Sequence, residues 1–403
     1  MVSSRAVIVL LIAQMVALFM YKNSSGGTFR TIFYQTLQYY ARPHTPQPSS
    51  FVYPPIVDAK SLWNGTYMMQ HPELWSEYLS VDSIKDFEIS IEHFLGLNKT
   101  IDRMTPEDFP VSPGVRSLIS RWKTELTHKG RGFVVVKGIP VRRWTMSQIE
   151  AFYAGLGHHM GVPGAQDTKS ELLGQVRDIG ADIRNERQYK SRGEIVYHCD
   201  AADVVGLLCL YPAKEGGASH IISSMSAYNE LLKLPKGQQY AHQLYQPALM
   251  DTRGTAHIKY AMIRPFSRDS NGVVRIFYHM EYFYSAYRRY PSLPPMDPEK
   301  LEAFHAMDSI IENNDYLRLE MNLQPGDLQL ISNHYILHSR TEFTDYTEEE
   351  RAVDPSKQKR HLLRLWVSID ELTTLREKVS KGLDQVQVLS SLVYAWIISQ
   401  ISN

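Results

Sequence analysis

Two residues separated by one position, His198 and Asp200, are of types that together bind metal ions. They lie in segment 194–211, whose composition predicts a β-strand, a short polar turn and a second apolar strand. Side chains at positions i and i+2 of a strand share one face, so the imidazole and the carboxylate should emerge side by side, while Cys199 points away. Such a pair supplies two of the three ligands of a two-histidine, one-carboxylate triad, which binds Fe(II) and leaves coordination positions open.

A third ligand is expected from a distant strand, and segment 324–340 offers one. A Pro-Gly-Asp turn at residues 325–327 precedes an apolar strand, with histidines near its far end. His334 and His338 are separated by an even number of residues, so strand alternation does not distinguish them. From spacing alone, either histidine could complete the site.

Two arginines of segment 359–367 could place positive charge near the metal. The segment predicts a further strand, in which Arg360 and Arg364 are an even number of residues apart and can face one interior. A guanidinium group there would pair with a carboxylate through two parallel hydrogen bonds. Arg364 could instead be a surface or ion-pair arginine.

Taken in order, these motifs resemble the TauD/TfdA (taurine dioxygenase-like) family of Fe(II)- and 2-oxoglutarate-dependent oxygenases. The similarity spans roughly residues 110–370, and the residues around the site are most similar to fungal members, whose products are often specialised metabolites. Four short motifs in matching order carry the resemblance: His198-Cys-Asp200, Gly216-Gly-Ala-Ser219, Leu337-His-Ser-Arg340 and Arg360-His-Leu-Leu-Arg364-Leu-Trp.

The resemblance implies that His198, Asp200 and His338 are the iron ligands. His338 is preferred to His334 because the family's ligand stands in a Leu-His-x-Arg setting. An aspartate at the carboxylate position argues against a halogenase, which would need that position vacant for halide. Without the other motifs, a lone His-x-Asp pair would more often be a hydrogen-bonded pair than a metal site.

The resemblance also implies a cosubstrate site. Arg360 would hold the far carboxylate of 2-oxoglutarate, assisted by the hydroxyl of Ser219 where other members carry threonine, and Arg364 would lie at the boundary between cosubstrate and substrate. O2 would drive decarboxylation of 2-oxoglutarate to succinate, coupled to oxidation of a small organic substrate. Hydroxylation is the default outcome, although desaturation, ring closure and epoxidation are compatible with the same ligands. Ser219 could instead simply belong to the glycine turn before it.

Two other classes of function compete with this interpretation. A non-catalytic, membrane-tethered binding or scaffold protein would lack a metal ligand or the cosubstrate arginine, and neither is missing. A metal-dependent isomerase that does not use 2-oxoglutarate would not need Arg360. Release of succinate from 2-oxoglutarate separates the three.

The predicted fold is mainly β with flanking α-helices, built on a double-stranded β-helix (jelly-roll) core. A β-branched strand is expected at 132–140, a helix at about 147–160, and a charged loop at 184–192 before the metal strand. An acidic loop is expected at 345–357. Four regions follow: an anchor or signal segment, 1–22; a spacer and helical region, 23–110; the oxygenase domain, 111–370; and a helical tail, 371–403.

The N-terminal run 6–21 is apolar and uncharged, with a length between that of a signal-peptide core and a short membrane span. No Ala-x-Ala cleavage site follows, which favours an uncleaved single-pass anchor, for example in the endoplasmic reticulum, over a secreted or luminal enzyme. Asn-x-Ser/Thr sequons at Asn23, Asn64 and Asn98 matter only if the body is luminal. A lipophilic substrate would give such an anchor a purpose.

Charge and cysteine content exclude two further classes. Forty-three basic residues balance forty-three acidic ones, which gives no net attraction to nucleic acid. Cys199 and Cys209 are the two cysteines, and two such residues do not make a disulfide framework. We expect both to be small buried side chains on neighbouring strands.

Overall fold

The computed structural model describes residues 48, 50–164, 171–180, 191–252, 259–268 and 273–372. The predicted anchor, most of the predicted loop 184–192 and the predicted tail helices beyond residue 372 lie outside these residues. Among the helices of the described part, none is both long and apolar enough to cross a bilayer.

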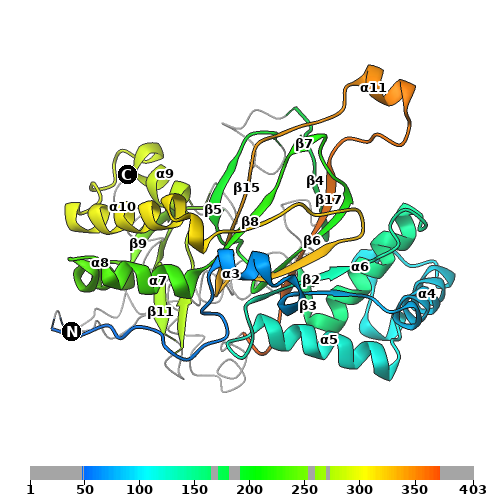
Figure 1. The fold of residues 1–403 in the computed structure, drawn as a ribbon, viewed down its shortest axis with the longest axis horizontal. Coiled ribbons are helices and arrows are strands. Elements are labelled where there is room, and N and C mark those ends of the chain that lie inside the picture. Colours follow the sequence, from blue (N-terminus) through cyan, green and yellow to red (C-terminus); the bar gives the residue numbers. More distant parts are fainter. Residues whose placement is uncertain are drawn as a thin grey trace, which may run out of the picture.

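Two β-sheets form the centre of the described chain, which confirms the coarse prediction of a sheet core with flanking helices (Figure 1). The larger sheet has seven strands, in the order β1 (Ser76–Tyr78), β2 (Phe133–Lys137), β14 (Leu328–Ser332), β6 (Val204–Tyr211), β17 (His361–Ser368) and β3 (Val162–Gly164), with β4 (Leu173–Val176) also paired to β17. The smaller sheet has four, in the order β13 (Leu319–Met321), β8 (Ser219–Ser223), β15 (Ile336–Arg340) and β5 (Ile195–His198).

Three two-stranded ribbons accompany these sheets. They are β9 (Ala248–Asp251) with β10 (Tyr260–Ile263), β11 (Phe266–Arg268) with β12 (Val274–Ile276), and β7 (Glu215–Gly216) with β16 (Phe343–Thr344).

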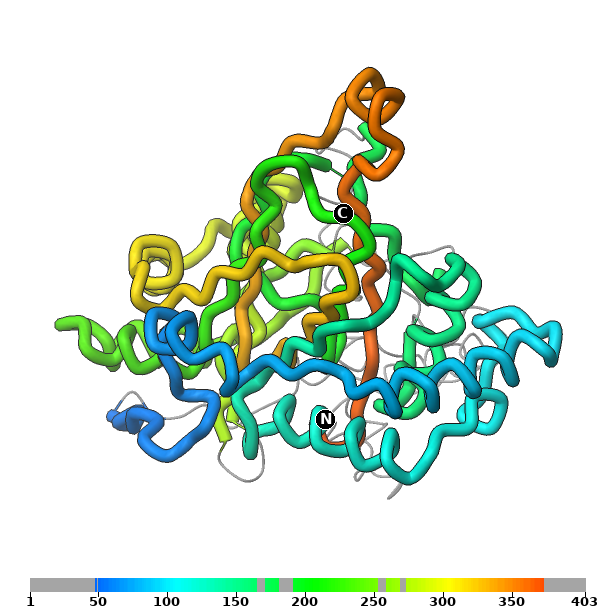
Figure 2. Tube along the Cα trace, turned by 45° about the vertical axis from the view of Figure 1, so that its right-hand side comes forward, coloured from blue at the N-terminus to red at the C-terminus, as the bar shows by residue number. Residues whose placement is uncertain are grey.

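Helices flank the sheets in two groups, on opposite sides in Figure 1. One group is α4 (Val81–Gly96), α5 (Pro113–Leu126) and α6 (Met146–Met160); the other is α7 (Ser224–Lys233), α8 (Gly237–Tyr245), α9 (Met280–Arg289) and α10 (Pro298–Asn313). The short helix α3 (Gly65–Gln70) precedes them, and α11 (Glu348–Val353) projects away from the body in Figures 1 and 2. The second group was not predicted.

Local sequence explains the elements that were predicted. β2 is buried from Phe133 to Val136, because β-branched and aromatic side chains suit a strand covered on both faces. α6 begins where Thr145 and Gln148 form a reciprocal capping box, and it ends at Met160, which confirms the predicted helix. The expected acidic loop 345–357 contains α11, so that prediction was incomplete.

The strands that carry the metal motifs cross between the sheets, which corrects two predictions. β5 belongs to the smaller sheet and β6 to the larger one, so they are consecutive in sequence but are not paired neighbours. Likewise, segment 324–340 is not one strand: β14 lies in the larger sheet and β15 in the smaller one. Sequence pattern cannot reveal such a crossing, because local periodicity predicts that a segment is a strand but not which sheet the strand joins.

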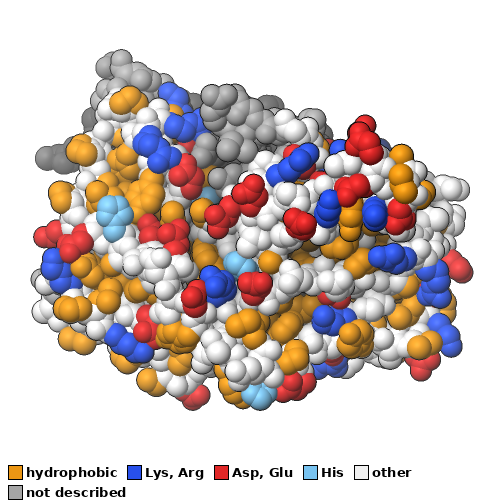
Figure 3. Space-filling view, turned by 45° about the horizontal axis from the view of Figure 1, so that its top comes forward, with side chains coloured by type: hydrophobic (Ala, Val, Ile, Leu, Met, Phe, Trp, Pro, Cys, Tyr) orange, Lys and Arg blue, Asp and Glu red, His pale blue; other side chains and the backbone are white. Residues whose placement is uncertain are grey.

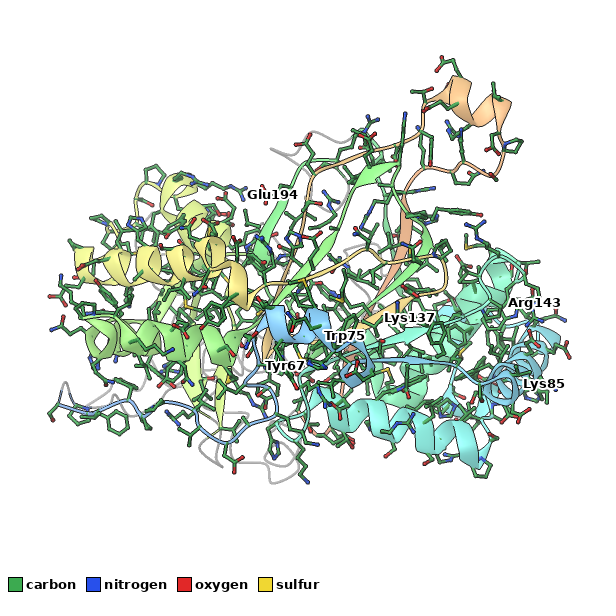
Figure 4. The ribbon with its side chains drawn as sticks, viewed as in Figure 1. Tyr67, Trp75, Lys85, Lys137, Arg143 and Glu194 are labelled. Atoms are coloured by element: carbon green, nitrogen blue, oxygen red, sulfur yellow. The ribbon has the colours of Figure 1, made fainter. Side chains whose placement is uncertain are left out.

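The N-terminal part of the described chain is held against the sheet edge. Trp75, which directly precedes β1, and Lys137, the last residue of β2, are labelled in Figure 4, and β1 and β2 are paired. The Trp75 indole donates to the carbonyl of Met68, and the Lys137 ammonium lies 3.4 Å from the Asp327 carboxylate in the turn before β14. On the face shown in Figure 3, acidic and basic side chains are interspersed, in keeping with the balanced charge of the sequence.

Candidate metal centre

Three side chains with the chemistry of metal ligands meet at the crossings between the sheets. One nitrogen or oxygen each from His198, Asp200 and His338 lies within 4.8 Å of the others. His198 and His338 are directly opposite each other on β5 and β15, and their rings are 4.2 Å apart at the centroids. The His338 Nε2 is 3.8 Å from an Asp200 oxygen. The structure therefore brings together the three residues expected to bind metal.

Asp200 reaches this cluster by a different route from the one predicted. β5 ends at His198, so Asp200 lies in the connection to β6 and not on the strand. Its backbone N–H donates to the Asn333 Oδ1 at 2.9 Å, and the Asn333 Nδ2 donates to the carbonyl of Ala202 at 2.8 Å. Asn333 thus fixes the connection that presents the carboxylate. Strand alternation therefore does not explain the position of the Asp200 carboxylate, which depends on the hydrogen bond to the side-chain amide of Asn333.

A backbone carbonyl orients the first histidine. The His198 Nδ1 lies 2.9 Å from the carbonyl oxygen of Val196, which can only accept a hydrogen bond. Nδ1 must therefore carry the proton, which leaves the Nε2 lone pair available to a metal. A hydrogen bond of this kind is the usual way in which a ligating imidazole is held in position.

His334, the alternative third ligand, is engaged elsewhere. It lies in the turn between β14 and β15, and its Nε2 is 2.8 Å from the Asp203 Oδ1. The other Asp203 oxygen accepts from the Ser368 hydroxyl at 2.9 Å and from the backbone N–H of Ile369 at 3.2 Å. This buried network connects the turn to the end of β17, so the role of His334 is to stabilise the fold.

The electrostatics of the cluster suit metal binding. Burial alone would raise the pKa of Asp200, but the Arg364 guanidinium and the two imidazoles outweigh it and hold that pKa well below its usual range. Burial lowers the pKa of His198, and burial together with the neighbouring His198 lowers the pKa of His338 to about 3. At neutral pH the carboxylate is therefore ionised and both imidazoles are neutral, which are the protonation states that coordination requires.

The cluster lines a cavity of about 130 Å³ whose wall is formed by residues of both sheets, of β9 and of α9. Ser219, Arg360 and Arg364, the residues expected to bind cosubstrate, line it as well. All the sequence-predicted site residues therefore share one cavity. Its remaining wall includes residues that sequence reasoning missed, among them Met250, Phe277, His279, Tyr282 and Arg340.

Arg360, the first residue of the predicted cosubstrate site, is a buried cation with an open donor. Its guanidinium lies over the Phe343 ring, 5.1 Å from the centroid, and its Nη1 is buried without a hydrogen-bond partner. Burial lowers its pKa to about 10, so the side chain stays protonated at neutral pH. A buried, charged donor without a partner is costly, and a bound anion would offset that cost.

The two other predicted cosubstrate residues have partners already. The Ser219 hydroxyl donates to the Gln329 Oε1 at 3.0 Å. The Arg364 Nη1 lies 3.4 Å from both oxygens of Asp200, and its guanidinium lies over the Trp366 ring. Arg364 therefore contacts the Asp200 carboxylate of the metal cluster.

Some of the missed residues carried a signal. Gln329 and Asn333 are polar residues within and after the apolar strand β14, and both are fully buried. A polar side chain in such a run has to find partners, so it could have been singled out. His279 and Tyr282, whose rings stack at 3.5 Å beside His198, gave no comparable signal, because their position depends on a distant strand contact.

The donor set fits a divalent iron ion with a dicarboxylic cosubstrate. Two imidazoles and one carboxylate are the ligands of a facial Fe(II) triad. The open Arg360 donor lies in the same cavity and provides the countercharge for a second carboxylate.

Gly217 allows us to test how tightly Arg360 is held. Its φ is +70°, and a Cβ there would stand 2.9 Å from the Arg360 Nε. Gly217→Ala is expected to displace the guanidinium and raise the Michaelis constant for 2-oxoglutarate about tenfold, in addition to about 1 kcal/mol of backbone strain. Gly180→Ala is the matched control, since Gly180 has a φ of +68° and nothing within 4 Å. Equal kinetic effects of the two substitutions would contradict the prediction.

Comparison with known proteins agrees with the geometry. The family described as "Taurine catabolism dioxygenase TauD, TfdA family" matches residues 112–366. FR-33289 synthase from Streptomyces rubellomurinus is 29% identical over 263 residues, covering 63% of this chain and 73% of the relative. Taurine hydroxylase-like protein SAT17 from Stachybotrys chartarum is 25% identical over 305 residues, covering 70% and 72%.

Solved structures share the fold. Asparagine oxygenase in complex with Fe(II), 2S,3S-3-hydroxyasparagine and succinate superposes with a TM-score of 0.55 at 16% identity, covering 77% of this chain and 98% of its own. The non-heme iron oxygenase OrfP in complex with Fe and alpha-ketoglutaric acid gives 0.52 at 14% identity, with coverage of 77% and 98%. The chain therefore belongs to the TauD, TfdA family and is a 2-oxoglutarate-dependent dioxygenase that uses Fe(II) and O2.

Proposed function

We propose that this dioxygenase binds Fe(II) through His198, Asp200 and His338, binds 2-oxoglutarate through Arg360 and Ser219, and hydroxylates a small organic molecule in fungal specialised metabolism. One observation carries the proposal: three potential metal ligands and a buried, unpartnered guanidinium Nη1 line a single cavity. The similarity to SAT17 from a fungus supports the biological setting.

The chain's own residues prepare the site for this reaction. Iron with bound 2-oxoglutarate and O2 would supply the oxidising chemistry, with release of succinate and carbon dioxide. Arg364 keeps Asp200 ionised, and the Val196 carbonyl holds the proton of His198 on Nδ1, away from the metal side. Asp200 and His338 are buried and His198 is partly buried, so the cluster is largely shielded from bulk solvent, which would protect a reactive site from side reactions.

We further propose that the two sheets form a double-stranded β-helix (jelly-roll) core. The crossings β5 to β6 and β14 to β15 support this, because strands of a jelly roll pass repeatedly between two facing sheets. Both sheets contribute residues to one interior cavity. The structural likeness to asparagine oxygenase is consistent with the same core.

A small substrate suits the cavity. The solved OrfP complexes contain (3S)-hydroxy-L-Arg, and the asparagine oxygenase complex contains a hydroxylated asparagine. The wall formed by Met250, Phe277, His279 and Tyr282 stands on the α9 side of His198, where a substrate would reach the metal. Asp251 and Thr252 line the same side, so this wall would offer a substrate both apolar contacts and polar groups.

Succinate release tests the proposed function. Full-length protein with Fe(II), ascorbate, 2-oxoglutarate and O2 is expected to release succinate, at a rate that rises when the correct substrate is added. No succinate under any condition would favour a non-catalytic binding protein. Conversion of a substrate without consumption of 2-oxoglutarate would favour a metal-dependent isomerase.

We also propose that residues 6–21 anchor the protein in a membrane and bring it close to a lipophilic substrate. The support is the apolar, uncharged run in the sequence. A truncated chain that begins at Thr28 is expected to leave the membrane fraction and to retain Fe(II) binding, because every proposed ligand lies beyond residue 190. Mass spectrometry of the mature N-terminus is the decisive measurement. A start between residues 22 and 30 would show a cleaved signal and a secreted or luminal enzyme.

A further inference from the structure

Arg340 is a second buried guanidinium beside the proposed cosubstrate site. It lies two positions after His338 on β15, directly opposite Ser219 on β8. Alternate residues of a strand share a face, so Arg340 faces the same interior as His338. Accordingly, it lines the same cavity as Ser219 and Arg360, and it is 6% exposed.

The hydrogen bonds of Arg340 leave one donor open. Its Nε donates to the carbonyl of Thr341 at 3.3 Å, and its Nη2 donates to the carbonyls of Ser191, at 3.0 Å, and Gly193. Its Nη1 is buried and has no hydrogen-bond partner. These bonds fix the orientation of the guanidinium plane and leave the remaining edge available.

Arg340 and Arg360 share the Phe343 ring. Their guanidinium carbons lie 4.7 Å and 5.1 Å from its centroid, and each has an unpartnered, buried Nη1. Among the described residues, no carboxylate forms an ion pair with either arginine. Asp345, which lies nearby, uses one oxygen to accept from the backbone N–H of Arg360.

Two neighbouring buried cations disfavour each other's charge. Both arginines are only 6% exposed, and neither has an ion-pair partner among the described residues. An anion bound between them would satisfy both open donors at once.

We propose that Arg340 and Arg360 jointly bind the far carboxylate of 2-oxoglutarate, one Nη1 donor from each arginine meeting the two carboxylate oxygens. This rests on the function proposed above and adds a second cation to it. The pair would make the site selective for dicarboxylic 2-oxo acids over monocarboxylic ones, because an uncharged chain end would leave two buried cations without a partner.

Binding measurements separate this role from a structural one. Calorimetric titration of the Mn(II)-loaded, full-length protein is made with 2-oxoglutarate and with 2-oxopentanoate, in which a methyl group replaces the far carboxylate. Arg340→Gln is expected to weaken binding of 2-oxoglutarate roughly 10- to 100-fold, the range for a lost hydrogen bond to a charged group. Binding of 2-oxopentanoate is expected to stay the same or to improve.

Two further variants complete the test. Arg340→Lys retains the charge and the aliphatic stem, so it should fold even if the glutamine variant does not, and it should lose part of the affinity for 2-oxoglutarate only. Arg192→Ala breaks the exposed ion pair with Asp178 on the segment that Arg340 holds, without altering the cavity wall, and should leave both affinities unchanged.

Each outcome bears on the proposal. Equal weakening of both ligands in the Arg340 variants, or the same loss in Arg192→Ala, would show that Arg340 merely holds segment 191–193 and would overturn it. Unchanged binding of 2-oxoglutarate in both Arg340 variants would overturn it as well. If the unmodified protein bound no 2-oxoglutarate at all, the proposed function itself would fail.

Discussion

Replacing His338 with alanine is expected to abolish Fe(II) binding and to lower 2-oxoglutarate turnover more than 100-fold, since loss of even an outer-sphere partner costs a metal site about 10- to 100-fold. The same result is expected for His198→Ala and Asp200→Ala. One potential ligand atom from each of these three side chains lies within 4.8 Å of the others, and no fourth histidine, cysteine or carboxylate of the described residues belongs to the cluster. Metal content and anaerobic Fe(II) titration measure the effect directly.

His334 provides the control for this substitution. His334→Gln keeps a hydrogen-bond donor for the buried Asp203 and should retain metal binding and most of the activity. His334→Ala leaves the Asp203 oxygen without this partner and is expected to lower the free energy of unfolding by about 3 kcal/mol while the metal site persists. Loss of Fe(II) in His334→Gln with retention in His338→Ala would mean that the wrong histidine had been chosen.

Arg360→Ala is expected to raise the Michaelis constant for 2-oxoglutarate on the order of 100-fold, because it removes one partner of a buried charge pair. Lysine at this position should restore only part of the affinity, since an ammonium group cannot reproduce the planar fork. Because Arg360 is a buried cation with an unpartnered Nη1 in the ligand-free protein, we expect the alanine variant to unfold at no lower temperature than the parent.

Lys359→Ala, at the exposed neighbouring position, is the matched control and should leave the constant unchanged. Initial rates of succinate release at varied 2-oxoglutarate give the constants, and thermal unfolding without metal gives the stability. An unchanged Michaelis constant in Arg360→Ala would remove this arginine from the cosubstrate site and direct attention to Arg364.

Most residues of the proposed site could be selected from the sequence, because they lie in short motifs that follow one another in a characteristic order along the chain. The structure brings His198, Asp200, Arg360 and Arg364 to one cavity, as the sequence predicted. Arg360 and Arg364 line the same cavity, although Arg360 precedes β17 and only Arg364 lies on the strand. Strand alternation gave the wrong account of Asp200, which reaches the cluster through a hydrogen bond to Asn333, 133 residues away.

Other features could not be deduced from local pattern. The pairing of β5 with β15, and of β6 with β14, depends on contacts between distant parts of the chain, and both partners in each pair read equally as buried strands. The helix α11 is different, because the Thr347 and Glu350 capping box that begins it was visible in the sequence. In the group α7–α10, the helix α10 also carried a visible start signal, because Asp297 caps it and Pro298 is its first residue.

The Asn333 side chain has a consequence for how the protein acquires its stability. Its Oδ1 accepts from the backbone N–H of Asp200 and its Nδ2 donates to the carbonyl of Ala202, while the backbone N–H of Asn333 donates to the carbonyl of Asp203. Asn333 therefore joins the two crossings between the sheets. The three potential ligands therefore come together only when both connections between the sheets have formed. At that point the two sheets are already joined. Metal affinity and global folding are thermodynamically linked here, so Fe(II) should raise the unfolding temperature in proportion to the logarithm of its free concentration.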